Sequence, residues 1–306
     1  MIMPILIQQL KGVINLALPL IALAFIKPSI FSNLTGVLLC SLGIGAYVAY
    51  LTYATTQKQA NSLGYAPSAE YKKTFDHMIT QCNLKPDQVN VRYGYTDDAV
   101  ATTMLNTVAV DPLMWKQIET DPQVGLVKQV LAGLLATLPA DKKSHQEKIA
   151  ADLTVGAQQF IFKHELGHVY YRYAIKKVLL CGAIAAIATL VGISVACLLR
   201  EHIILAIVLG MLAGGLTDLF LSYSSNIFFK YYEEKKADLF AARYSSAQDI
   251  NAAADFFEKY RDHATAYKKP MGLIAYIPQV ILSGHPDGKI RAQYLRDLAA
   301  QKNNRV

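Results

Sequence analysis

Residues 164–199 read HELGHVYYRYAIKKVLLCGAIAAIATLVGISVACLL, a short polar motif followed by a long apolar run. The part from 178 to 199 carries no charged side chain. A bilayer core of roughly 30 Å is crossed by about 20 apolar helical residues, so this run is long enough to span it. No proline interrupts the pattern from about residue 145 onward. We therefore expect a helix that carries the motif and continues directly into a membrane span.

Three further apolar runs accompany this one. Residues 34–54 are uncharged and predict a second span, and residues 203–221 predict another that contains Asp218. An ionisable residue in a span is a functional candidate, but Asp218 lies near the end of its run and can simply reach the interface. The run 12–26 is short and contains Pro19, so a cleaved signal peptide and an interfacial helix are alternatives. Because a span follows closely, we interpret the two N-terminal runs as an anchor hairpin.

The composition agrees with a lipid bilayer as a partner. Hydrophobic residues make up 53% of the chain and charged residues only 17%, against roughly a quarter in soluble domains. The net charge is +7, but no dense basic tract and no nucleic-acid recognition motif is present, so we expect no nucleic-acid partner. The four cysteines form no CxxC pair, which indicates a reducing or membrane setting.

The connecting segments predict the topology. Segments 55–177 and 222–306 carry nearly all the lysines and arginines outside the short turns, so both are expected on the cytoplasmic side. Alternating apolar residues at 89–95 and a second run at 106–110 predict two strands. The remaining polar segments read mainly as helices. A compact domain would therefore be assembled from two segments that a membrane hairpin separates in the sequence.

The motif at the start of the quoted stretch has the spacing of a metal site. On a helix, His164 and His168 stand one above the other on the same face, as two ligands of a tetrahedral zinc ion require. Glu165 is offset around the axis, where it can take a proton from water at an open coordination position. The alternative is a surface helix with two solvated histidines, which the apolar neighbours Phe160 and Phe162 disfavour.

A second pair of residues with helical spacing follows the membrane hairpin. Glu234 and Asp238 are four residues apart, so one carboxylate could bind the metal while the other orients a ligand histidine. Taken alone, the pair reads more simply as a charged helix face with Glu–Lys neighbours beside a membrane.

Together, HExxH at 164–168, a hydrophobic hairpin and Glu234-x-x-Ala237-Asp238 resemble the HtpX-like membrane zinc metallopeptidases, relatives of the type I CAAX prenyl proteases. The resemblance implies one zinc ion per chain, bound by His164, His168 and Glu234. It also implies that Glu165 is the general base and that Asp238 orients a ligand from behind.

The same family carries a His-Pro signature with an arginine six residues after the histidine. Here it reads HPDGKIR at 285–291. By resemblance, His285 would stabilise the tetrahedral intermediate and Arg291 would brace the site, which suits the chemistry of a developing oxyanion. Without the other motifs, a loop histidine and a surface arginine would be the simpler interpretation.

The family also has an edge strand that pairs with the substrate backbone. The matching residues here are Asp98, Ala99, Val100 and Ala101. Asp98 stands in place of an asparagine and Val100 in place of an aromatic residue. Residues 115–150 resemble an insertion relative to the family, as a lid or a partner surface would.

These observations predict a mainly α integral membrane protein. We expect about four transmembrane helices and a cytoplasmic α+β catalytic domain of the zincin type, with a small β-sheet. The expected divisions are 1–56, an N-terminal transmembrane hairpin; 57–177, the first part of the catalytic domain; 178–222, a second transmembrane hairpin; and 223–306, the second part with the third zinc ligand.

The predicted function is that of a zinc metalloendopeptidase in which zinc-activated water hydrolyses peptide bonds. The expected substrates are membrane or membrane-associated polypeptides, and the resemblance alone adds protein quality control. It also suggests a bacterial cytoplasmic (inner) membrane with the site on the cytoplasmic side. One alternative is a non-catalytic zinc-binding scaffold, but such a protein would not need a general base such as Glu165. The other is a transporter, for which a single acidic residue in a span is weak evidence. The sequence leaves the oligomeric state and the cleavage preference open.

Overall fold

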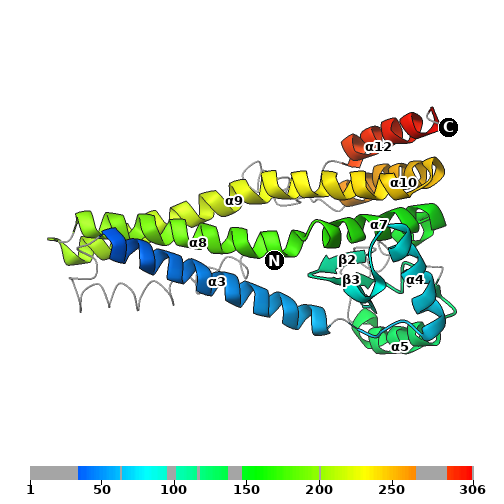
Figure 1. The fold of residues 1–306 in the computed structure, drawn as a ribbon, viewed down its shortest axis with the longest axis horizontal. Helices are drawn as coiled ribbons and strands as arrows, with labels where there is room; N and C mark the ends of the chain where they lie inside the picture. The colour runs from blue at the N-terminus through cyan, green and yellow to red at the C-terminus, as the bar shows by residue number, and fades with distance from the viewer. Residues whose placement is uncertain are drawn as a thin grey trace. The chain divides into compact units, whose positions relative to one another are not determined.

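The computed structural model describes residues 34–62, 64–94, 101–115, 118–136, 147–199, 201–266 and 288–304. These residues are mainly helical, with one small sheet (Figure 1). They fall into two compact units. One unit holds the described residues of Met1–Thr55 and Ile175–Asn226, and the other holds those of Thr56–Ala174 and Ile227–Val306.

Three helices are long and apolar enough to cross a membrane. They are α3 (Leu34–Ser62), α8 (Tyr173–Leu198) and α9 (Ile203–Tyr244), with candidate spans over Thr35–Asn61, Tyr173–Leu198 and Ile204–Tyr244. The helices predicted over 34–54, 178–199 and 203–221 are thereby confirmed. The first apolar run, 12–26, lies outside the described residues. These three candidate spans indicate an integral membrane protein.

Glycines set the helix spacing within the first unit. A methyl group added to Gly45 of α3 would lie 2.6 Å from the carbonyl oxygen of Gly182 in α8. A methyl group on Gly192 of α8 would lie 2.9 Å from the carbonyl oxygen of Gly210 in α9. Small residues at such crossings let helices approach closely, which is the usual way in which apolar helices associate in lipid.

Two helix boundaries differ from the expectation. The first is at Leu153 and Thr154, which are not helical, and the hydroxyl oxygen of Thr154 accepts a hydrogen bond from Ala157 N as an N-cap. The pattern from 145 onward predicted continuous helix into the span, but α7 (Val155–Tyr170) ends before α8 begins at Tyr173. Tyr171 and Arg172 form a turn, and Arg172 has a φ of 53°, in the left-handed region. Because a left-handed residue cannot continue a right-handed helix, the chain breaks here although neither glycine nor proline marks the position.

The sheet belongs to the second unit and contains three strands in the order β1–β3–β2. β1 (Asn90–Tyr93) runs parallel to β3 (Thr107–Val110), and β2 (Ala101–Met104) runs antiparallel to it. β1 and β3 match the two predicted strands. All four residues of β3 are buried, whereas β2 is mostly half-buried and lies at an edge of the described sheet.

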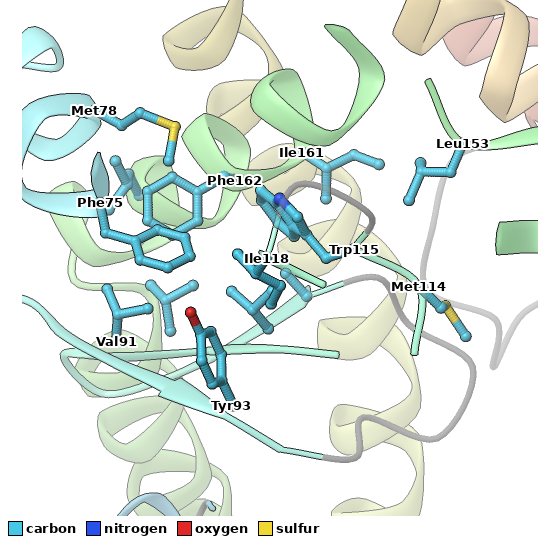
Figure 2. Packing of buried hydrophobic residues seen from close by; sticks show 14 of the residues in the cluster. Phe75, Met78, Val91, Tyr93, Met114, Trp115, Ile118, Leu153, Ile161 and Phe162 are labelled. Atoms are coloured by element: carbon cyan, nitrogen blue, oxygen red, sulfur yellow. The ribbon is translucent and has the colours of Figure 1, made fainter. Parts of the chain in front are cut away.

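An aromatic cluster forms the core beside this sheet. Figure 2 shows Phe75, Tyr93, Trp115 and Phe162 gathered in one group. Ring centroids are 5.2 Å apart for Phe75 and Phe162, and 5.9 Å apart for Trp115 and Phe162. Phe162 belongs to α7, so this packing fixes the helix that carries the HExxH motif against α4 (Ala69–Gln81) and the sheet.

The remaining helices complete the second unit. They are α5 (Pro122–Ala136), α10 (Ala247–Ala266) and α12 (Gly288–Asn303). A capping box starts α10, because Ser246 N donates to Asp249 Oδ2 at 3.2 Å and Asp249 N donates to Ser246 Oγ at 3.1 Å. Ala292 and Leu295 of α12 are buried in a cluster with Ile250 of α10, which places Arg291 toward the interior.

Candidate metal centre

Two helices supply the centre, and small residues hold them close together. A methyl group added to Gly167 of α7 would lie 3.0 Å from the Cα atom of Ala237 in α9, and Ala237 itself is fully buried. The close approach brings the HExxH face of α7 against the turn of α9 that carries Glu234 and Asp238. The glycine and the alanine thus act as spacers for the polar residues around them.

His164, His168 and Glu234 form a buried group whose ligand atoms lie together. The two Nε2 atoms are 3.2 Å apart. Glu234 Oε2 lies 3.4 Å from His164 Nε2, and Glu234 Oε1 lies 3.4 Å from His168 Nε2. Tetrahedral zinc with bonds of about 2.0–2.1 Å places its ligand atoms about 3.3 Å apart. The three atoms therefore form one face of a tetrahedron of the right size for zinc.

Asp238 and Arg291 support this group from behind His164. Asp238 Oδ1 lies 2.8 Å from His164 Nδ1. Arg291 binds the same carboxylate with two nitrogens, Nε at 2.8 Å from Oδ2 and Nη2 at 2.5 Å from Oδ1. The carboxylate therefore accepts the Nδ1 proton of His164, which leaves the Nε2 lone pair directed at the ligand group. Arg291 also lies over the ring of Phe257, 3.7 Å from its centroid.

The charges of this cluster shift the pKa of its members. Burial lowers the pKa of His164, but the charge and hydrogen bond of Asp238 outweigh burial and raise the pKa to about 9. Burial also acts against the charged form of Arg291, yet Asp238 raises the pKa of the guanidinium above its ordinary value. The Asp238–Arg291 pair is therefore ionised, and within it Asp238 raises the pKa of His164 while Arg291 lowers it.

His168 is held in a different way. Among the described residues its Nδ1 atom is buried and has no hydrogen-bond partner. Its ring packs instead against Tyr173, with centroids 4.9 Å apart, and Tyr173 stacks on Phe229 of α9 at 5.5 Å. Aromatic packing thus orients the second histidine. Tyr173 was not among the site residues predicted from the sequence.

Glu165 lies beside the metal-binding group without belonging to it. Its side chain is 9% exposed, and Thr103 Oγ1 donates a hydrogen bond to Glu165 Oε2 at 2.6 Å. Thr103 lies on β2, 62 residues earlier in the chain, and no sequence pattern indicated this contact. One oxygen of the carboxylate is thus already bound by the sheet.

The other predicted site residues are placed in part. Ala101 begins β2 and is 5% exposed. Asp98, Ala99, Val100 and His285 lie outside the described residues. The structure therefore brings together His164, Glu165, His168, Glu234, Asp238 and Arg291, and it leaves the substrate strand and His285 as predictions.

A comparison with known families gives one match. The family described as Peptidase family M48 matches residues 124–299, more than half of the chain. No curated protein and no solved structure gave a match. The matched range contains all three residues of the metal-binding group and both residues that support His164.

Proposed function

Because the chain belongs to peptidase family M48, the HtpX-like zinc metallopeptidases, we propose that it is a membrane-embedded endopeptidase acting on membrane or membrane-associated polypeptides. The observation that carries the proposal is the spacing of the ligand atoms of three buried side chains. The atoms lie 3.2 to 3.4 Å apart, which matches one face of a zinc tetrahedron. Three apolar candidate spans in the same chain support substrates at the bilayer.

The residues divide the chemical work between them. His164, His168 and Glu234 would hold one zinc ion per chain, and zinc, when bound, polarises a carbonyl oxygen and lowers the pKa of water. Glu165 takes a proton from the attacking water and passes it to the leaving amine. Asp238 keeps the Nε2 lone pair of His164 available, and its own position depends on Arg291.

Two further roles extend the proposal on the family pattern. His285 would donate a hydrogen bond to the oxygen that becomes negative in the tetrahedral intermediate. Residues 98–101 would pair with the backbone of an extended substrate, since strand addition at an exposed edge is a general way of binding peptides. The described part of this segment, Ala101 in β2, lies at an edge of the described sheet, which supports the idea.

The arrangement in the cell follows from the same proposal. Four spans, with the run 12–26 as the first, would place 57–177 and 223–306 together as one zincin-type catalytic domain. The excess of lysine and arginine in these segments supports a cytoplasmic location of that domain, and a bacterial inner membrane fits the family resemblance. Removal of damaged membrane proteins is the physiological role we propose.

The test compares the full-length protein with two variants in detergent. We expect the wild type to contain one zinc per chain and to cleave casein or itself. Glu165→Gln should keep its zinc and lose roughly 10²–10⁴-fold in rate, since that is the usual contribution of a general base. His168→Ala should lose the metal. Equal cleavage by the wild type and Glu165→Gln would contradict the proposed mechanism. A wild type without zinc would contradict the proposed metal site. Zinc content without any cleavage would indicate a scaffold.

A further inference from the structure

The hydroxyl group of Thr103, on strand β2, forms a hydrogen bond with the side chain of Glu165. Thr103 Oγ1 lies 2.6 Å from Glu165 Oε2 and 3.1 Å from the backbone oxygen of Glu165. We propose that Thr103 is a positioning residue, which holds the carboxylate of Glu165 and so links edge strand β2 to the catalytic base. This inference rests on the proposed function, because it takes Glu165 as the base.

The two distances indicate which bond matters. A hydroxyl group has one proton to donate, and the bond to a carboxylate oxygen is stronger and shorter than the bond to a backbone carbonyl. The 2.6 Å contact is therefore the one that the proton makes. It fixes Oε2 of Glu165, and Oε1 is the oxygen left to receive a proton from water. The contact also removes rotational freedom from a side chain that must face the metal.

The position of Thr103 is itself set by the sheet. Thr103 stands opposite Val108 in the antiparallel pair of β2 with β3, and every residue of β3 is buried. Val108 is fully buried, so this register cannot slip without exposing apolar surface. The strand therefore fixes the position of the Thr103 hydroxyl. A peptide that paired with the edge of this strand would meet a base already aligned with it.

Three variants test the inference, with labelled casein as the substrate and the full-length protein in detergent. Thr103→Val keeps the shape of the side chain and removes the hydroxyl, and we expect kcat to fall about 10-fold with KM and zinc content unchanged. Thr103→Ser retains the hydroxyl and should restore kcat to within about twofold. Thr107→Val makes the same change on β3, where the hydroxyl meets Asn90 rather than the site, and should leave kcat unchanged.

The outcomes separate this inference from the proposed function. A wild-type kcat for Thr103→Val, with Glu165→Gln inactive, would overturn the role of Thr103 and leave the enzyme mechanism standing. An equal fall in kcat for Thr107→Val, or loss of zinc from Thr103→Val, would show a merely structural role and would also overturn it. Full activity of Glu165→Gln would instead contradict the proposed function itself.

Discussion

At the residue scale, the two ligand histidines are held by different forces. His164 donates its Nδ1 proton to a buried carboxylate that is itself bound by arginine, whereas His168 is oriented by the rings around it. A carboxylate behind a ligand histidine fixes the tautomer and raises the basicity of the ring, so the two histidines should respond differently to substitution of their neighbours.

Replacing the carboxylate behind His164 tests this directly. Asp238→Asn keeps the shape but removes the negative charge, and we expect zinc affinity to fall about 10- to 100-fold. The measurement is zinc retention against a chelator of graded strength. Asp255→Asn is the matched control, because Asp255 is exposed and paired with Arg296 on the surface. If the two variants retained zinc equally, the carboxylate would have no part in metal binding.

Removing the arginine tests stability rather than binding. Arg291→Leu would leave the fully buried Asp238 carboxylate without its cation, and breaking a buried pair in this way costs about 3–5 kcal/mol of unfolding free energy. Arg296→Leu breaks two exposed pairs, which typically contribute about 0–1 kcal/mol each. Thermal unfolding in detergent should show a large drop in midpoint for the first variant and a small one for the second. Similar midpoints would mean that the buried pair is not a stabilising unit.

At the scale of elements, the site depends on the distance between α7 and α9. A close approach involves Gly167, where an added methyl group would lie 3.0 Å from Ala237 Cα and 3.2 Å from Phe240 Cβ. Contacts this tight leave no room for a larger side chain unless the helices separate. Separation would move Glu234 away from both histidines, because it lies on α9 and they lie on α7.

A larger side chain at this crossing should therefore weaken the metal site. We expect Gly167→Leu to reduce both zinc content and casein cleavage, although none of the ligands is changed. Gly125→Leu is the control, since an added methyl group there meets nothing within 4 Å, in an exposed part of α5. Normal zinc content in Gly167→Leu would show that the helices tolerate a wider spacing.

Some of the secondary-structure elements could be predicted from the local sequence pattern. Strands β1 and β3 were both predicted, because the alternation of apolar residues within each depends only on neighbouring residues. The turn at Tyr171 and Arg172 and the strand β2 were not predicted as such. Neither glycine nor proline marks the turn, and β2 overlaps the edge strand expected by resemblance only at Ala101.

At the scale of the whole molecule, the long helices expose many large apolar side chains, whose contact with water would be unfavourable. Leu39 is 65% exposed, Leu179 63%, Ile204 79% and Phe228 75%. Large apolar surfaces of this kind mark contact with a membrane or with another protein, and the length and composition of the helices favour the membrane.

Membrane extraction tests this reading. We expect the full-length protein to stay in the membrane pellet after washing with alkaline carbonate, because three apolar spans are held by the hydrophobic effect and not by charge. High salt should likewise fail to release it, whereas a mild detergent should solubilise it with zinc bound. Release by carbonate alone would show that the apolar helices do not cross the bilayer.

The sequence by itself determined the ligand residues and the apolar helices. Glu234 became a candidate ligand only through the family resemblance. The two histidines four positions apart and the uninterrupted apolar runs at 34–54 and 178–199 are written in short-range spacing. Spacing of this kind needs only the geometry of one helix to be interpreted.

Only the tertiary structure decided how these residues are held. Thr103 binds Glu165 across 62 residues, Arg291 binds Asp238 across 53, and Tyr173 orients His168 through ring packing that no spacing predicts. The physical reason is that a helix repeats every 3.6 residues and therefore specifies its own faces, but not which distant segment covers each face. That choice depends on the packing of α7, α9, α12 and the sheet around one buried core.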